Sequence, residues 1–371
     1  MNFLIITHVR HTCKNGQYFG YAPYIREMNM WLQCVDHAEV IAPLVKKSSS
    51  NIEIAYSQDL LNFTDVPAFQ ITSLTNTLAT FIKLPFIIFK LFKGMKSADH
   101  IHLRCPGNMG LLGSVIQIFF PFKSKTVKYA GNWDPNSKQP LTYKLQKWII
   151  SNTFLSRNTK VLVYGEWPNQ TNNIIPFFTA SFSKKEIIDL KPKKLGEKIN
   201  FIFVGSLVDG KQPLLAIKIV EALKKKGHHA INLKIFGEGI LKQSLLDYVK
   251  QKKLDGYVKI CAGISLEELK EEYCKAHFSI LPSKSEGWPK AVAEAMFFSC
   301  VPITTPVSCV PWMLNNGERG ILLNHNFEKN IDEIIKVIRS PEQFSRMSKN
   351  AAEWSTKYTL EYFESEIQKI L

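Results

Sequence analysis

Hydrophobic residues in this chain gather in short runs, separated by longer stretches in which apolar positions recur at helical spacing. In the first half, the runs predict strands at residues 3–7, 39–41, 101–103, 126–130 and 161–164. The pattern restarts in the second half and predicts strands at 199–204, 232–236, 258–261, 278–281 and 302–304. Strands that alternate with helices are typical of doubly wound parallel sheets, so two such series predict two similar α/β domains with a cleft between them.

A polar stretch separates the two series. Residues 183–198 are rich in Lys and carry Pro192 and Gly196, which is typical of a linker. We therefore expect a first domain at residues 1–188 and a second at 189–350. The remaining segment, 351–371, has the length and the amphipathic pattern of a helix.

Composition narrows the class of protein. With 371 residues, 45% of them hydrophobic and 12% aromatic, the chain is an ordered globular protein rather than a disordered one. Its seven Cys are scattered and form no Cys-x-x-Cys pair, so we expect reduced thiols in a cytoplasmic protein, without a disulfide framework or a zinc site. The first apolar run is too short for a signal peptide, and no run reaches the roughly 18 apolar residues that span a bilayer.

The charge is strongly positive. The formal net charge is +15, and residues 1–190 carry 20 Lys and Arg against 11 Asp and Glu. Such a balance favours contact with anionic surfaces such as lipid headgroups or nucleic acid. Within residues 77–96, apolar bulk is interleaved with Lys83, Lys90, Lys93 and Lys96, which is the composition of a helix lying at a membrane interface. A core helix whose lysines extend their amino groups to solvent would have the same composition.

Two carboxylates with seven residues between them carry the main chemical signal. Glu286 stands in a loop, since Pro289 fits the first position of a helix, and Glu294 then lies on the second turn among apolar residues. A carboxylate there is costly unless donors such as ligand hydroxyls meet it, and a helix start favours an anion such as a diphosphate. The alternative is that Glu294 pairs with a Lys or Arg and that Glu286 is a solvated acid.

The surroundings of this pair favour the functional reading. An apolar strand precedes it and another follows, the order of a phosphate site at the carboxyl ends of parallel strands. The segment Ser-Glu-Gly-Trp-Pro-Lys-Ala-Val-Ala-Glu-Ala-Met, with Gly317 and residues 320–323 after it, resembles the donor-binding region of retaining GT-B glycosyltransferases of family 4. The resemblance is specific over residues 199–325 and diffuse in the first half. It implies two Rossmann-like domains that face each other across a cleft, with the helix at 351–371 returning to the first domain.

The same resemblance implies roles for donor-site residues. Glu294 would hold the ribose hydroxyls of a nucleotide-sugar, and Glu286 the hydroxyls of the transferred sugar. Lys211 precedes a helix start at Pro213, where the helix dipole disfavours a cation unless a phosphate is bound. The resemblance implies that Lys211 binds the donor diphosphate. The alternative is that Lys211 is a solvated surface lysine. Five more residues complete the expected donor site, namely Gly205, Gly237, Gly287, Trp288 and Pro289. Trp288 would wall in the donor or pack in the core, and the helix start at Pro289 would stabilise the diphosphate.

The first domain should hold the acceptor. A loop expected at residues 8–20 carries Gly16, and residues 99–108 resemble a family stretch that ends in an active-site His. Arg104 stands at that place here, and His102 lies on the same side of the strand, so either could point into the cleft. A core position is the alternative for His102. Asn108 and Asn132 are further candidates for the cleft.

The resemblance thus implies a retaining glycosyltransferase that moves a sugar from a nucleotide-diphosphate-sugar to a lipid-linked or saccharide acceptor, in the assembly of a bacterial surface polysaccharide. We expect no metal or other cofactor, and the sequence has no Asp-x-Asp motif. We expect attachment at the inner face of the cell membrane through anionic lipid, and no nucleic acid. A GT-B nucleotide-sugar epimerase, a phosphorylase, or a non-catalytic basic protein that binds membrane or nucleic acid are the alternatives.

Overall fold

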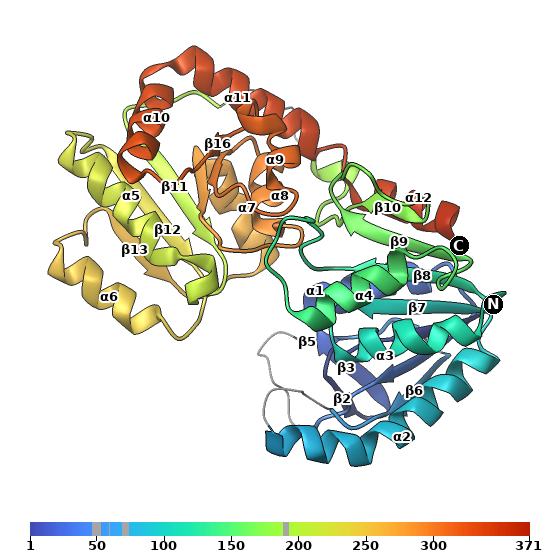
Figure 1. The fold of residues 1–371 in the computed structure, drawn as a ribbon. Helices are drawn as coiled ribbons and strands as arrows, with labels where there is room; N and C mark the ends of the chain where they lie inside the picture. The colour runs from blue at the N-terminus through green and yellow to red at the C-terminus, as the bar shows by residue number, and fades with distance from the viewer. Residues whose placement is uncertain (47–52, 59, 69–73, 188–192) are drawn as a thin grey trace. The chain divides into compact units, whose positions relative to one another are not determined.

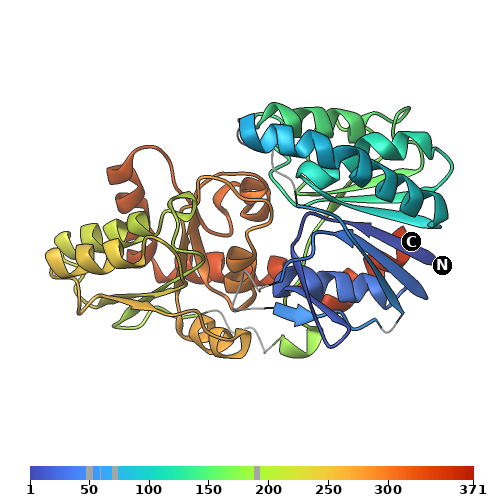
Figure 2. The ribbon, with the colours of Figure 1, turned by 90° about the horizontal axis from the view of Figure 1, so that it is seen from below.

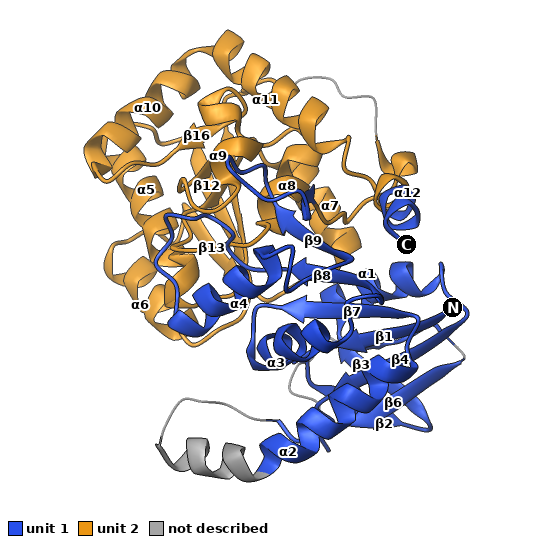
Figure 3. Ribbon diagram, turned by 45° about the vertical axis from the view of Figure 1, so that its right-hand side comes forward, with its two compact units in different colours: residues 1–177, 364–371 blue, residues 178–363 orange. Residues whose placement is uncertain are grey.

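A computed structural model describes residues 1–46, 53–58, 60–68, 74–187 and 193–371, with the side chains of 74–82 left out. The chain forms two compact units, residues 1–177 with 364–371 (unit 1) and residues 178–363 (unit 2), drawn in blue and orange in Figure 3. The division after Phe177 falls before the expected boundary at 188. Of the expected linker, residues 188–192 lie outside the described part of the chain.

Unit 1 is built on a seven-stranded parallel sheet with the order β10-β9-β8-β7-β1-β4-β6 (Figure 1). Its strands are β1 (Asn2–Ile6), β4 (His37–Ala42), β6 (Leu61–Asp65), β7 (His100–Cys105), β8 (Ser124–Tyr129), β9 (Thr159–Tyr164) and β10 (Ile174–Phe177). The central strands are almost completely buried, because helices cover both faces of the sheet.

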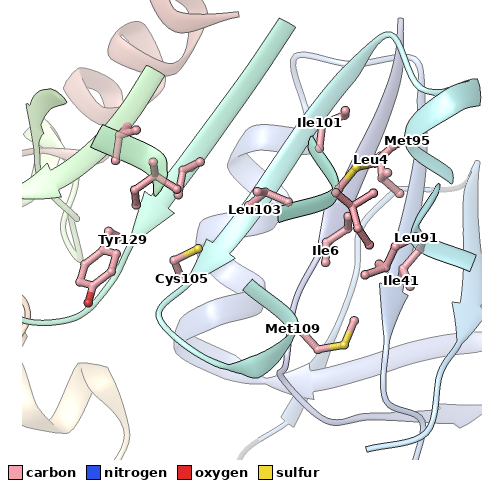
Figure 4. Close-up of a cluster of buried hydrophobic side chains, with 14 of the residues drawn as sticks. Leu4, Ile6, Ile41, Leu91, Met95, Ile101, Leu103, Cys105, Met109 and Tyr129 are labelled. Atoms are coloured by element: carbon pink, nitrogen blue, oxygen red, sulfur yellow. The ribbon is translucent and has the colours of Figure 1, made fainter. Parts of the chain in front are cut away.

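Three helices cover one face of this sheet, namely α2 (Leu74–Ser97), α3 (Asn108–Ile116) and α4 (Leu141–Ser151), and α1 (Ala22–Leu32) covers the other (Figure 2). Figure 4 shows part of the core on the three-helix face, where Leu4 and Ile6 of β1 and Leu103 of β7 meet Leu91 and Met95 of α2. Alternate residues of the same strands, such as Phe3 and His102, face α1 through Trp31.

A second, antiparallel sheet with the order β2-β3-β5 occupies the place of the expected loop at 8–20. Its strands are β2 (His11–Lys14), β3 (Gln17–Tyr21) and β5 (Glu53–Ala55). Asn15 and Gly16 connect β2 to β3 with φ of 51° and 79°, the left-handed conformation that a two-residue hairpin turn requires. The expected loop is therefore mostly a β-hairpin, and Gly16 lies in its turn.

Unit 2 contains a six-stranded parallel sheet with the order β13-β12-β11-β14-β15-β16. Its strands are β11 (Ile199–Val204), β12 (Ile231–Phe236), β13 (Val258–Cys261), β14 (Phe278–Leu281), β15 (Val301–Thr304) and β16 (Ile321–Leu322). Its helices of four residues or more are α5 (Pro213–Lys225), α6 (Lys242–Gln251), α7 (Leu266–Lys275), α8 (Lys290–Phe297), α9 (Val310–Met313), α10 (Phe327–Arg339) and α11 (Pro341–Ser355). All ten expected strands are confirmed.

The expected helix at 351–371 is instead the end of α11 followed by α12 (Leu360–Ile370). Only residues 364–371 belong to unit 1, where the Lys160 side chain donates to the carbonyl of Ile370 at 2.7 Å. Among the described helices, none is long and apolar enough to cross a membrane.

Candidate functional site

The order of strands in unit 2 reverses between β11 and β14, so the loops after these two strands diverge at a topological switch point, where ligands of α/β sheets bind. Three interactions tie the two loops together. The backbone N–H of Lys284 donates to the carbonyl of Gly210 at 2.9 Å, and the Lys284 amino group lies 2.5 Å from Asp209 Oδ2. The third interaction joins two residues that the sequence assigned to the donor site.

Lys211 and Glu286 form that third interaction, with 2.5 Å between Nζ and Oε1. The Lys211 side chain is 30% exposed and that of Glu286 only 8%. Lys211 ends the short 3-10 turn η3 (Asp209–Lys211), and Pro213 occupies the first position of α5, as expected. The folding of the two loops thus brings a phosphate-binding candidate and a sugar-binding candidate into one ion pair.

Helix α8 begins at Lys290, so Pro289 is its N-cap rather than its first residue. A proline cap supplies no side-chain acceptor for the first N–H groups of the helix. The helix start therefore keeps the electrostatic character that suits an anion.

Glu294 lies on the second turn of α8 and meets hydroxyl donors, but they belong to the protein. Ser181 Oγ donates to Oε1 at 2.6 Å, and the Tyr273 hydroxyl lies 3.3 Å from Oε2. Burial, and after it the charge of Glu294, raises the pKa of Tyr273 well above its usual value. Within the described ranges no Lys or Arg forms an ion pair with Glu294, and a small pocket lies beside it. A carboxylate accepts about four hydrogen bonds, so two bonds leave capacity for a ligand.

Trp288 is only 7% exposed and belongs to an aromatic cluster. Its ring centroid lies 5.9 Å from that of Trp354, 6.3 Å from Trp312 and 5.6 Å from Tyr358. The ring is thus packed in the core, which was the alternative for Trp288, and it also lines the small pocket beside Glu294.

The three glycines of the expected donor site differ in what they do. A Cβ on Gly237 would overlap the carbonyl oxygen of Gly205, because the loops after β11 and β12 pack directly on each other. Gly205 itself has room, since a Cβ there would keep 3.7 Å from its nearest neighbour. The carbonyl of Gly287 accepts from Ser308 Oγ at 3.1 Å.

In unit 1, Arg104 and His102 have different surroundings. Arg104 lies near the carboxyl end of β7, where its Nη1 is 3.2 Å from Glu27 Oε1 and its guanidinium lies over the Tyr24 ring. Burial is the largest single influence and lowers the pKa of Arg104, but Glu27, Tyr164 and Tyr24 together outweigh it and raise the arginine pKa. His102 is fully buried, with Nδ1 2.8 Å from Thr126 Oγ1 and its ring against Trp31. Burial holds its pKa well below the usual value. His102 is therefore a core histidine, and the expected role at the sugar is wrong for it.

His8 is a residue that the sequence reasoning missed. It follows β1 at the same edge of the sheet and is exposed. It lies against Gly107, since a Cβ on that glycine would come within 2.9 Å of His8 Nδ1. Desolvation, and after it the charge of Arg104, lowers the pKa of His8. A histidine just beyond the end of a first strand was the available signal.

The other acceptor candidates serve local structure as well. Asn108 is the first residue of α3. Asn132 Oδ1 accepts from the backbone N–H of Asp134 at 2.9 Å and so shapes the loop after β8. Across the residues that the structure describes, no group of three His, Cys, Asp or Glu side chains could hold a metal ion.

Two units of this kind, each built on a parallel sheet with helices on both faces, are the components of the GT-B fold. A solved structure supports this class: HepE of Anabaena, crystallised with UDP, has a TM-score of 0.67 at 11% identity, and the alignment covers 99% of this chain and 97% of that one. Residues 184–354 match the model of the family described as glycosyl transferases group 1. Over this segment, a little under half of its length, the chain is similar to that family.

Curated relatives are also named as glycosyltransferases, and their alignments cover a smaller part of this chain. An uncharacterized glycosyltransferase of Methanocaldococcus jannaschii is 25% identical over 46% of each chain. An N-acetylgalactosaminyltransferase of Campylobacter jejuni, named for a diphospho-undecaprenol substrate, is 24% identical over 76% of this chain and 79% of its own. The alignments span about half the length of the first two curated relatives, 46% and 56%.

Proposed function

We propose that this protein is a retaining glycosyltransferase that moves a sugar from a nucleotide-diphosphate-sugar to a lipid-linked or saccharide acceptor. The observation that carries the proposal is the Lys211–Glu286 pair at the switch point of a glycosyl transferases group 1 domain. The UDP bound by HepE and the lipid-linked substrate in the name of the Campylobacter relative support the two substrate classes. The capsular polysaccharide enzyme of Staphylococcus aureus among the relatives supports a place in surface polysaccharide assembly.

In the proposed reaction, the bond between sugar C1 and the diphosphate breaks, and its electron pair stays on the phosphate oxygen. The acceptor oxygen bonds to C1, and its proton leaves with the diphosphate. Lys211 and the start of α8 stabilise the charge that develops on the diphosphate, a task for preorganised groups. Glu286 holds Lys211 in place and accepts from sugar hydroxyls, while Glu294 accepts from the ribose.

We assign the acceptor side to the carboxyl edge of the unit 1 sheet, at His8 and Arg104. The ion pair with Glu27 fixes the guanidinium of Arg104, and His8 beside it is exposed. The reaction is proposed to need no metal ion.

We also propose that unit 1 contacts an anionic membrane, through what we call the phenylalanine face: Phe86, Phe89 and Phe92 of α2 with Phe119 and Phe122. These side chains are 43% to 88% exposed, which is unusual for large apolar groups in a single patch. Phe92 packs on Phe120 at 4.9 Å, and the Lys123 amino group donates to the Lys96 carbonyl at 2.9 Å, so the two segments are neighbours. Residues 74–160 contain thirteen Lys or Arg and only two Asp or Glu.

The donor site is tested by Lys211→Ala. We expect affinity for UDP to fall about ten-fold or more while affinity for uridine is almost unchanged, because a charge-assisted hydrogen bond to phosphate is lost. Calorimetry with both ligands, with and without EDTA, measures this, and EDTA should have no effect. Lys284→Ala is the matched control, since Lys284 also pairs across the two loops but is 51% exposed.

Equal losses for UDP and uridine, or an equal effect in the control, would contradict the assignment of Lys211. A nucleotide-sugar panel then separates the reactions. A transferase releases the nucleoside diphosphate and lengthens an acceptor, whereas an epimerase returns an altered nucleotide-sugar and a non-catalytic protein does neither.

A further inference from the structure

An open hollow in unit 1 is lined by the loop after β8, by α4 and by the segment after β9. Its volume is about 410 Å³, and Trp133, Asp134, Gln139, Lys147, Trp148 and Gln170 contribute to its walls. Trp133 and Asp134 belong to the same turn as Asn132, which was expected at the cleft. Aromatic rings, a carboxylate, an amine and amides together form a polar, aromatic wall rather than an apolar groove.

The inner wall is held in place by hydrogen bonds. Trp133 is 3% exposed, and its Nε1 donates to Gln170 Oε1 at 2.9 Å. Gln139 Nε2 donates to the Asn132 carbonyl at 2.5 Å and to Ser137 Oγ at 2.8 Å. The Tyr129 ring packs edge-on against Trp133 with 4.8 Å between centroids. The shape of the hollow is therefore formed before a ligand arrives.

Lys147 presents a cation to this hollow. Its amino group lies over the rings of Tyr129 and Trp133, at 5.4 Å and 5.0 Å from their centroids. Within the described chain, no carboxylate forms an ion pair with it. Burial lowers its pKa to about 8 against the opposing charge of Asp134, so the amine is still mostly protonated at pH 7. Its N–H donors suit ligand oxygens.

Trp148 supplies the outer wall, and its side chain is 60% exposed. A flat indole face is apolar and rigid and suits the C–H face of a pyranose ring, while polar groups nearby take up the hydroxyls. Trp148 also follows Leu141 and Leu145 in an exposed apolar stripe on α4, which would suit a membrane. Lys144 and Lys147 also line the hollow, so its net charge does not exclude anionic headgroups; the hydrogen-bond acceptors of Asp134, Gln139 and Gln170 are what favour the hydroxyls of a sugar.

We propose that this hollow binds a saccharide unit, with one sugar ring on Trp148 and its hydroxyls at Lys147 Nζ and Asp134. If the transferase function proposed above holds, this is the place for a sugar of the acceptor. Binding of the free sugar does not depend on that function.

Saturation-transfer NMR on the full chain tests the proposal, with glucose, galactose, N-acetylglucosamine, N-acetylgalactosamine and glucuronic acid as probes. We expect transfer to at least one sugar, and a loss of about five-fold or more in Trp148→Ala, because the stacking surface is gone. Leu145→Ala is the matched control on the same helix and should bind as the parent does. Lys147→Met keeps the packing of the stem on the rings, and it should weaken glucuronic acid most if the amine receives a carboxylate.

The proposal is wrong if no probe binds, or if the transfer signal to the sugar is unchanged in Trp148→Ala. It is also wrong if the signal falls equally in Leu145→Ala. A loss of the signal in Glu286→Ala would place the sugar in unit 2. Loss of vesicle binding in Trp148→Ala with sugar binding kept would assign Trp148 to a membrane instead. UDP binding measured in parallel separates the two proposals. If the protein binds UDP but no sugar, only the proposal of a saccharide site is contradicted. If it binds a sugar at Trp148 but no UDP, the proposed transferase function is contradicted.

Discussion

The pairing of Lys211 with Glu286 changes what a substitution at either position means. Because the Glu286 side chain is 8% exposed, removal of Lys211 leaves a largely buried carboxylate without its partner. A loss of activity in a single variant is then partly a loss of loop structure. The comparison between a diphosphate ligand and a nucleoside isolates the phosphate contact, since both ligands meet the same altered loop.

At Gly237, one added methyl group should destabilise unit 2. The Cβ of Gly237→Ala would overlap the Gly205 carbonyl oxygen. That oxygen is part of the backbone, so it cannot move aside as the end of a flexible side chain could. We expect a loss of about 1–3 kcal/mol in the free energy of unfolding. Chemical denaturation measures it, with Gly263→Ala as control, since a Cβ there meets nothing within 4 Å. Equal stability of the two variants would show that the loops are not packed as described.

At the residue scale, the sequence predicted correctly whether a candidate residue lies in a strand or in a loop. It placed Lys211 and Glu286 in loops after two strands of the second domain, but their contact joins residues 75 positions apart and depends on how the loops fold. The period of two put His102 and Arg104 on one side of β7, and it carries no information on depth. In the structure His102 is buried against Trp31 and therefore lies in the core.

At the scale of elements, α2 carries the prediction about the membrane. We expect the protein to cosediment with vesicles of anionic lipid and to lose this binding as salt rises, since the screening length is about 10 Å at 0.1 M. Replacing Lys90 and Lys93 with Glu should release the protein, because Phe89 and Phe92 beside them are exposed and would insert. UDP binding should be kept.

Lys218→Glu with Lys250→Glu is the control for net charge, since both lysines are exposed on helices of unit 2. Equal recovery with neutral and anionic vesicles, or equal release in the control, would show that α2 is an ordinary helix of the protein surface.

Elements with continuous apolar runs were predictable, since buried parallel strands are hydrophobic on both faces. The small β2-β3-β5 sheet was not predicted, because its strands are short and β5 is only partly buried. The pair Asn15-Gly16 was the available signal for the hairpin. The units divide at 177, the end of strand β10, which stood outside the predicted series because only its first and last residues are buried.

At the scale of the whole molecule, buried histidines in unit 1 should make stability depend on pH. Burial lowers the pKa of His11 and of His100 to about 4. Their neutral form is favoured in the folded state, so the stability they contribute is present above about pH 6.5 and is lost as pH falls toward 4. At pH 5 each would cost about 2 kcal/mol relative to neutral pH.

Urea denaturation at pH 7.5 and pH 5 measures this difference in the free energy of unfolding. His100→Gln should reduce the difference, and His37→Gln, at an exposed position of β4, should leave it unchanged. The same pH dependence in all three proteins would mean that His100 does not titrate as described.

Unit 1 is assembled from two distant parts of the chain, while unit 2 is one continuous segment. A ribosome releases the chain from its N-terminus, so nearly all of unit 1 emerges first, yet its last piece, residues 364–371, emerges after unit 2 is complete. The contact of Lys160 with Ile370 can form only then. The first unit to begin folding is thus the last to be completed, and a nascent chain that stops before residue 364 presents unit 1 without its final segment.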